Sequence, residues 1–227
     1  IKKLYPSLRF NLVEHDMTAQ SYQRKLRDSR GWRRIYVGWQ LNRILKKERL
    51  YCRKADCLFT FNQKDKRLIR EQYGRDDSRV LNLFLGLEDQ ILEKQIDSKK
   101  RQYGNICFLG QMGRPENHTA AMRLIAIARR VKEQLPTLQV YIVGNQPSEE
   151  LKRQADDYIH VTGFVDDVDE YLERAWLAVF PLNQGAGIKM KVLRSLAMGT
   201  PVVTTMVGAE GIDEDGEVIE LAETDEE

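Results

Sequence analysis

The stretch GAGIKMKVLRSLAMGTPVVTT, residues 185–205, decides the fold class of this chain. It begins with a turn built on Gly185 and Gly187, and its apolar residues between Ile188 and Ala197 then recur at the spacing of one helical face. It ends in the β-branched run PVVTT, which is typical of a buried strand. A turn, a helix and a strand in this order predict one repeat of an α/β layer.

The same alternation continues upstream of this stretch, back to residue 105. Helices are expected at residues 117–135, 148–156, 168–175 and 188–199. Strands are expected at residues 105–110, 138–144, 158–163, 176–182 and 201–205. Such regular alternation predicts a parallel sheet that carries helices on both of its faces.

The first hundred residues show a similar but less regular alternation of expected strands and helices. Strands are expected at residues 8–16, 56–62 and 78–86, and helices at residues 33–54 and 63–74, the second of them closed by Gly74. A Lys-rich run, EKQIDSKKRQYG (residues 93–104), separates this part from the next. We therefore predict an α/β chain of two domains, residues 1–98 and residues 99–227.

The helix expected at residues 33–54 is basic and amphipathic. Its apolar residues follow a rough 3.6-residue stripe formed by Ile35, Trp39, Leu41, Ile44, Leu45 and Leu50. We expect this stripe to face the core, with the basic residues opposite.

Charge divides the chain into two parts, although the net charge is only +2. Residues 1–104 hold 25 Lys and Arg against 13 Asp and Glu, whereas residues 105–227 hold 11 against 21. A basic part invites nucleic-acid or anionic-membrane partners. Because the basic residues are spread along helices without a nucleic-acid reader motif, no nucleic-acid partner is expected. Peripheral contact with an anionic membrane and plain solvated helix faces remain as alternatives.

Several other classes of protein find no support in the sequence. The longest apolar runs fall far below the roughly 20 residues of a membrane span, and no signal-peptide cleavage site follows the chain start. Cys52, Cys57 and Cys107 lack metal-ligand spacing, so we expect packing residues in a reducing compartment. Since His118 and His160 lack spaced carboxylate or cysteine partners, no metal site is expected. Neither a dinucleotide fingerprint nor a P-loop is present.

Small residues follow the predicted strands of the second domain. They are Gly110, Gly144, Gly163, and Gly185 with Gly187. Because ligands of open parallel sheets bind outside the carboxyl ends of the strands, these loops are the predicted wall of a site.

The start of the helix after Gly187 suits an anion. The N–H groups of a first helical turn and the helix dipole favour negative charge, and Lys189 and Lys191 would add full positive charges beside it. This pattern indicates a diphosphate cradle, and an ordinary solvated helix start with two surface lysines is the alternative. The local sequence does not separate the two.

Four segments taken together resemble a known family. They are FLGQMGRPEN (residues 108–117), LQVYIVG (138–144), VTGFVDDVDEYLERAWLAVFPL (161–182) and GAGIKMKVLRSLAMGTPVVTTMVGAEGI (185–212). In this order they are similar to the carboxyl-terminal domain of group 1 glycosyltransferases, the retaining family 4 type. The resemblance implies the GT-B fold, in which two Rossmann-like domains face each other.

Residues 1–98 resemble the second half of the amino-terminal domain of the same family more weakly. The similarity rests on EHD, the long basic helix and ADCLFTFN. Family members commonly begin with further strands and end with helices that cross back to the first domain. The resemblance thus implies an incomplete first domain and a truncated second one, in a fragment or a naturally abbreviated relative.

The resemblance also implies which residues form the site. His15 corresponds to a histidine that relatives place near the donor sugar, and Asp16 lies beside it, so these two are the catalytic candidates. The donor-binding candidates are Gly110, Gln111, Arg114, Asn117, Gly144, Gly163, Phe164, Val165, Gly185, Ala186, Gly187, Ile188, Lys189, Lys191 and Arg194.

The match to the family's site is uneven. Gln111 and Asn117 occupy places where many relatives have a phosphate-binding Arg and Lys. Ala186 and Arg194 occupy the places of the family's two glutamates. Lys189 and Lys191, with Arg114, are then the phosphate candidates, while Arg194 has no role in this scheme. The loop from Gly163 to Val165, with Asp166 and Asp167, is expected to face the base.

The resemblance implies a nucleotide-sugar-dependent glycosyltransferase of the hexosyltransferase type. It would move a sugar to a glycan or lipid-linked acceptor, with retention and without a metal or cofactor, in bacterial surface-polysaccharide or glycoconjugate synthesis. Such an enzyme is expected to be cytoplasmic or membrane-associated. The alternative, motivated by Ala186, Arg194, Gln111 and Asn117, is a catalytically degenerate domain that binds or stabilises a partner.

Overall fold

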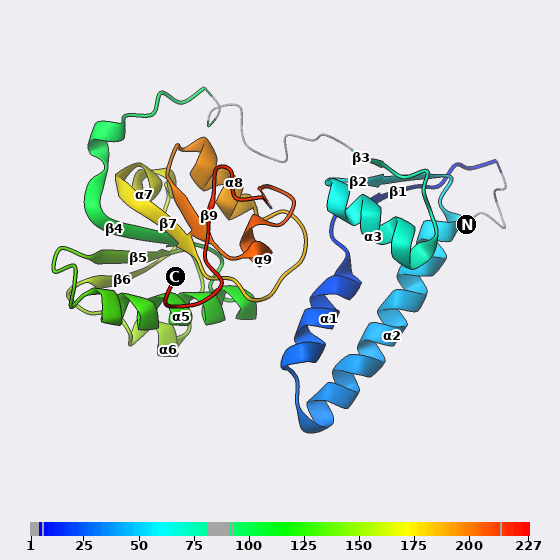
Figure 1. The fold of residues 1–227 in the computed structure, drawn as a ribbon, viewed down its shortest axis with the longest axis horizontal. Helices are drawn as coiled ribbons and strands as arrows, with labels where there is room; N and C mark the ends of the chain where they lie inside the picture. Colours follow the sequence, from blue (N-terminus) through cyan, green and yellow to red (C-terminus); the bar gives the residue numbers. More distant parts are fainter. Residues whose placement is uncertain (1–4, 6, 81–90, 92, 214) are drawn as a thin grey trace. The chain divides into compact units, whose positions relative to one another are not determined.

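The chain folds as two compact units. The computed structural model describes residues 5, 7–80, 91, 93–213 and 215–227 (Figure 1). The first unit comprises Ile1–Phe84 with Gln184–Ile188, and the second comprises Leu85–Asn183 with Lys189–Glu227. Each unit is an α/β structure with its own parallel sheet.

The division between the units falls earlier in the chain than residue 98, where the sequence places it. Ile91 is buried in the larger apolar core, and the Lys94 ammonium lies 2.8 Å from the Glu173 carboxylate. Residues that follow the division therefore pack as part of the second unit. The Lys-rich run that looks like a connector holds a 3₁₀ turn, η1 (Ser98–Lys100), and the first residues of a strand.

In its described residues, the first unit is a three-stranded parallel sheet with three helices. Its elements are β1 (Asn11–Glu14), α1 (Thr18–Asp28), α2 (Gly31–Lys54), β2 (Cys57–Thr60), α3 (Gln63–Tyr73) and β3 (Arg79–Val80), with strand order β1-β2-β3. Helix α3 begins where the Asn62 side chain accepts a hydrogen bond from the Asp65 N–H at 2.7 Å, and Gly74 closes it as predicted. Of the strand expected at residues 78–86, residues 81–86 lie outside the described residues.

The expected apolar stripe of α2 is wrong for half of its members. Ile35, Trp39 and Leu50 are exposed, and the residues of α2 that are buried are Val37, Leu41, Glu48 and Cys52. The true inner face repeats about every four residues and includes a carboxylate. Glu48 is tolerated there because its two oxygens accept from the Ala19 N–H at 3.0 Å and the Tyr73 hydroxyl at 2.5 Å.

Glu14 lies close to Glu48 and to two further carboxylates. Burial raises the pKa of Glu14 to about 7, and the neighbouring carboxylates Glu48, Asp65 and Asp16 act in the same direction. The protonated form of Glu14 is thus favoured by folding.

We expect the free energy of unfolding to fall as the pH rises from about 4.5 to about 7. Over this window the folded chain binds more protons at Glu14 than the unfolded chain does, and the stabilisation is fully present only below 4.5. Glu14→Gln should remove this pH-dependent contribution, which is on the order of 2 kcal/mol once the full linkage value is reduced for solvent screening of a partly exposed carboxyl. Urea unfolding followed by circular dichroism at several pH values measures it. Glu71→Gln, on the exposed side of α3, is the control, and equal pH slopes for Glu14→Gln and the unmodified chain would contradict the expectation.

The second unit is a six-stranded parallel sheet between helices. Its further elements are β4 (Gln102–Leu109), α5 (Pro115–Val131), β5 (Gln139–Val143), α6 (Glu149–Lys152), β6 (Ile159–Gly163), α7 (Asp169–Arg174), β7 (Ala175–Phe180), α8 (Met190–Ala197), β8 (Val202–Thr204), α9 (Met206–Ala209) and β9 (Glu220–Leu221). The predicted alternation is confirmed here, since each expected strand and helix has a counterpart within a few residues.

The strand order of this sheet is β6-β5-β4-β7-β8-β9, and every pair is parallel. Helices α5 and α6 cover one face while α7 and α8 cover the other (Figure 1). The chain reverses its direction of travel across the sheet at β4, which makes the end of β4 the point where a crevice opens. The core beneath it centres on Phe108 and Phe180, whose ring centroids lie 5.7 Å apart.

Some features were not predicted from the sequence. Helices α1 and α9 and strand β9 were missed. Cys52 and Cys107 are buried packing residues as expected, but Cys57 is exposed, so that prediction is wrong for one of the three. Among the described residues, none of the helices combines the length and apolar character needed to cross a membrane.

Candidate functional site

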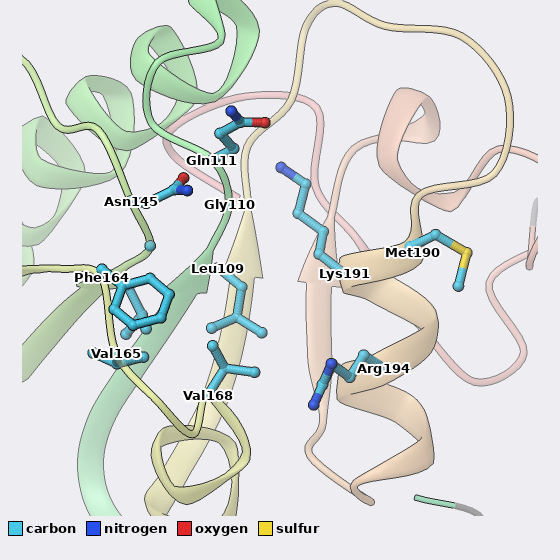
Figure 2. Close-up of a pocket in the computed structure, with 12 residues that line it drawn as sticks. Leu109, Gly110, Gln111, Asn145, Phe164, Val165, Val168, Met190, Lys191 and Arg194 are labelled. Carbon is cyan, nitrogen blue, oxygen red and sulfur yellow. The ribbon is translucent and has the colours of Figure 1, made fainter. Parts of the chain in front are cut away.

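A pocket of about 650 Å³ lies at the carboxyl ends of the strands of the second unit (Figure 2). Loops after three neighbouring strands form one side of it, and the first turns of α8 form the other. It is lined by Leu109, Gly110, Gln111, Val143, Gly144, Asn145, Phe164, Val165, Val168, Met190, Lys191 and Arg194. Both the place and the size are typical of a ligand site in an open parallel sheet.

The floor of the pocket is backbone that is hydrogen-bonded from loop to loop. The Gly110 N–H donates to Val143 O at 3.0 Å, and the Gly144 N–H donates to Gly163 O at 3.2 Å. Gly144 has a φ of +142°, and a Cβ on it would lie 1.8 Å from the Gly110 carbonyl oxygen. Only glycine allows the two loops to cross this closely, so a ligand meets main chain rather than side chains here.

Lys191 places its ammonium group in this pocket. The group lies 5.0 Å from the Phe108 ring centroid and 5.8 Å from that of Phe180, and it donates to Asn117 Oδ1. Asn117 is itself held by donation from its Nδ2 to the Gln111 carbonyl at 2.9 Å. In Figure 2 the Lys191 side chain extends from α8 toward the loop of Gln111. Asn117 thus positions Lys191 rather than lining the pocket.

The charge of Lys191 is only partly compensated. Burial lowers its pKa to about 8, and the nearby charge of Arg114 lowers it as well, against an opposing effect of Glu116. A bound anion would reverse this shift, because it would favour the charged form. The ammonium is therefore prepared for a negatively charged ligand.

Arg194 lines the pocket one turn further along α8. Its Nε donates to Asp169 Oδ1 at 2.7 Å, and the other Asp169 oxygen lies 3.8 Å from the Lys94 ammonium. Asp169 fixes the guanidinium from outside the lining. The described lining residues consequently include two cations and no carboxylate, which suits an anionic ligand.

The opposite wall of the pocket is apolar. Phe164 is 74% exposed, and Val165 and Val168 lie beside it in the loop that leads to α7. An exposed ring of this kind can stack on a flat heterocycle. A ligand with an aromatic group at one end and a negative charge at the other would fit both walls.

The structure brings seven of the sequence-predicted donor residues together in the pocket. They are Gly110, Gln111, Gly144, Phe164, Val165, Lys191 and Arg194. Gly163 lies behind them, hydrogen-bonded to the Gly144 N–H, and Arg114 is exposed at the start of α5. His15, Asp16, Gly185, Ala186, Gly187 and Ile188 belong to the first unit, where the His15 ring packs against Phe61.

Lys189 and the two predicted base-facing aspartates lie elsewhere in the second unit. The Lys189 ammonium is 3.5 Å from the Glu210 carboxylate, and both side chains are nearly buried. Asp166 and Asp167 line a neighbouring hollow with Lys94 and Arg194 rather than the pocket itself.

Five lining residues were missed from the sequence: Leu109, Val143, Asn145, Val168 and Met190. Leu109, Val143 and Asn145 flank glycines that were chosen, so extending each strand-end glycine by one residue would have found them. Met190 and Val168 carry no such signal.

Comparisons with known proteins point to one enzyme class. A family model described as "Glycosyl transferases group 1" matches residues 104–227. A comparison with the sequences of curated proteins finds no match.

Solved structures with a similar fold are also glycosyltransferases. The pneumococcal O-GlcNAc transferase GtfA in complex with UDP and GlcNAc is 17% identical, with a TM-score of 0.64 over 80% of this chain and 37% of that one. Anabaena Alr3699/HepE in complex with UDP-glucose is 13% identical, with a TM-score of 0.64 over 94% and 58%. WaaG, described as a glycosyltransferase involved in lipopolysaccharide biosynthesis, is 18% identical, with a TM-score of 0.59 over 91% and 62%. This chain therefore spans between about a third and about three fifths of the length of these structures.

Proposed function

The chain belongs to the glycosyl transferases group 1 family, and from that premise we propose that the pocket of the second unit binds a nucleotide-sugar donor whose sugar is transferred to an acceptor. The family predicted from the sequence motifs is confirmed, and so is the α/β fold with parallel sheets of the GT-B type. The chain covers part of that fold.

The observation that carries this proposal is the composition of the pocket. Lys191 and Arg194 supply positive charge on one wall, while Phe164 supplies a flat apolar surface on the other. A nucleotide-sugar combines a base with a diphosphate. In this proposal the base stacks on the apolar wall and the diphosphate contacts the cationic wall. UDP-glucose in the HepE structure is a nucleotide-sugar, and UDP in the GtfA structure is a nucleoside diphosphate.

The same residues can promote sugar transfer. Cleavage of the bond between sugar and phosphate builds negative charge on the departing diphosphate, and a fixed cation at that place lowers the barrier. Lys191 has this role in our proposal because its ammonium lies against apolar rings, where a charge acts strongly. His15 and Asp16 are proposed as the catalytic pair at the donor sugar, with residues 185–188 as further donor contacts.

The wider role follows from the family resemblance. We propose retention of configuration, a glycan or lipid-linked acceptor, and a place in bacterial surface-polysaccharide or glycoconjugate synthesis at the cytoplasmic side of a membrane. Of the solved structures above, WaaG is described as acting in such a pathway.

A second candidate function is a catalytically degenerate domain that stabilises a partner. By the family resemblance, Ala186 and Arg194 stand at the places of the family's two glutamates, and Arg194 is engaged by Asp169. On this alternative the pocket binds a nucleoside diphosphate, but the complete protein releases no sugar from any nucleotide-sugar. Sugar release that is lost on His15→Ala would exclude it.

A nucleoside diphosphate is expected to raise the melting temperature of the chain. A ligand at about one hundred times its dissociation constant stabilises the folded state by about 2.7 kcal/mol, which is a shift of several degrees for a unit of this size. UDP, GDP and ADP should be tested in parallel by thermal shift, with the nucleosides as controls that lack the charge. A melting curve that none of the diphosphates moves would contradict the proposed function.

A further inference from the structure

The side of α2 that faces away from the first core exposes a group of large apolar side chains. Trp32 and Ile35 are 79% and 77% exposed, and Tyr36 and Trp39 are each 53% exposed. These four residues, called here the aromatic patch, lie three and four positions apart and so share one face of the helix. Single exposed apolar residues are ordinary, but a contiguous group of this size marks an interaction surface.

The aromatic patch lies at a projecting point of the first unit. Helices α1 and α2 form an antiparallel hairpin, and the first turns of α2 lie at its tip, away from the three-stranded sheet (Figure 1). Helix α2 has 24 residues and is therefore about 36 Å long.

Positive charge continues the same face of α2 beyond the patch. The helix holds eight Lys and Arg and a single acidic residue, Glu48, which is buried and hydrogen-bonded. Arg43, Lys46 and Lys47 are exposed on the turns that follow Trp39. The exposed side of α2 thus carries cations without any carboxylate to compensate them.

One of the cationic groups also contacts a ring of the aromatic patch. The Arg43 guanidinium lies 4.5 Å from the centroid of the Trp39 ring, and the Tyr36 and Trp39 rings are 6.3 Å apart. At a lipid surface the phosphates lie outside the boundary with the acyl chains. The Arg43 guanidinium over the Trp39 indole could contact a phosphate while the indole lies at that boundary.

We propose that this face of α2 docks on the surface of an anionic lipid bilayer. The aromatic patch would enter the boundary between headgroups and acyl chains, where Trp and Tyr are favoured, and Arg43, Lys46 and Lys47 would contact lipid phosphates. A nucleic acid fits less well, because Ile35 is one of the two most exposed members and offers a base neither a ring nor a hydrogen bond. The inference rests on α2 alone and not on the proposed donor site.

Vesicle binding by the whole chain tests this inference. Co-sedimentation with phosphatidylglycerol-containing vesicles should be strong at low salt and weak with pure phosphatidylcholine. The double variant Trp32→Ser/Ile35→Ser should weaken binding by at least about tenfold, since it removes the most exposed apolar area. Arg43→Gln/Lys46→Gln/Lys47→Gln should weaken it by about fivefold for each charge removed, and this loss should shrink at high salt.

Two control variants remove residues of the same types from the second unit instead of from α2. Trp176→Ser removes an exposed Trp from the second unit, and Lys152→Gln removes an exposed Lys there. Neither should change vesicle binding. Circular dichroism should show that all variants fold, because every substituted side chain is at the surface.

A readout of depth separates insertion from plain electrostatic adsorption. With Trp39→Phe and Trp176→Phe, Trp32 remains as the one Trp among the three in the sequence, and vesicles should shift its emission to shorter wavelength. Binding that is lost with the charges but leaves this emission unchanged would overturn the proposal. So would equal loss in the control variants, or failure to bind anionic vesicles. Self-association or RNA binding that disappears in Trp32→Ser/Ile35→Ser, without vesicle binding, would assign the face to another partner.

Discussion

Replacing Lys191 with methionine is expected to weaken nucleoside diphosphate binding between about 10- and 100-fold. A hydrogen bond to a charged group contributes about 1.5–3 kcal/mol, and each 1.4 kcal/mol is a factor of ten in affinity. Methionine keeps the apolar contacts with Phe108 and Phe180 but removes the ammonium. Isothermal titration calorimetry with the diphosphate that gives the largest thermal shift measures the loss.

The pH dependence of nucleoside diphosphate binding is a second expected result for Lys191. The terminal phosphate of a nucleoside diphosphate is already ionised above neutral pH, so a further rise in pH changes mainly the ammonium. Because the pKa of Lys191 is about 8, affinity in the unmodified chain should fall as the pH rises through that value. The Lys191→Met chain should show weak affinity on both sides of it.

Matched variants show whether Lys191 is the group responsible. Lys152→Met removes an exposed ammonium from the same unit and should leave both the affinity and its pH dependence unchanged. Affinity within about threefold of the original after Lys191→Met, a difference of roughly 0.7 kcal/mol, would remove Lys191 from the diphosphate site.

The pocket could be located from the sequence because its position follows from topology. Glycines after parallel strands meet at one edge of a sheet, and this rule selected Gly110 and Gly144, which both line the pocket. The two lysines at the start of α8 are a different matter. Lys189 is the extended residue just before α8, whereas Lys191 lies in the first turn of the helix, so Lys191 enters the pocket while Lys189 pairs with Glu210. The choice depends on Glu210, which is 21 positions away and has no local signal.

Arg194 shows the same limit. Its spacing of three from Lys191 places both on one helix face, which the sequence does reveal. Its partner Asp169 comes from α7, on the other side of β7, and only the folded sheet brings the two together. The carboxylate that pairs with Arg194 therefore lies outside the pocket lining, where it holds the guanidinium rather than a ligand.

Helix α2 was correctly predicted as a helix but given the wrong inner face. Residue type alone assigned Ile35 and Trp39 to the core, whereas Glu48 is inside because Tyr73 completes its hydrogen bonding. A buried carboxylate of this kind cannot be recognised until its partner is known. Ile35 and Trp39 therefore stay exposed and belong to the proposed lipid-docking face.

Replacing Gly144 with alanine is expected to destabilise the second unit by at least about 3 kcal/mol. The new Cβ would lie 1.8 Å from the Gly110 carbonyl oxygen, and the φ of +142° is rarely adopted by an L-residue. Urea unfolding followed by Trp176 fluorescence, with Trp32 and Trp39 changed to phenylalanine, reports on this unit alone.

Gly163→Ala is the matched control for Gly144→Ala. Gly163 also has a positive φ, +71°, but a Cβ there meets nothing within 4 Å. Gly163→Ala should lower the free energy of unfolding only by the strain of an alanine in a left-handed backbone conformation, about 1 kcal/mol. Equal losses for the two variants would mean that backbone conformation alone accounts for the effect. A larger loss for Gly144→Ala would show that the crossing of the two loops is a rigid element, and the floor of the proposed donor pocket would then be fixed before any ligand arrives.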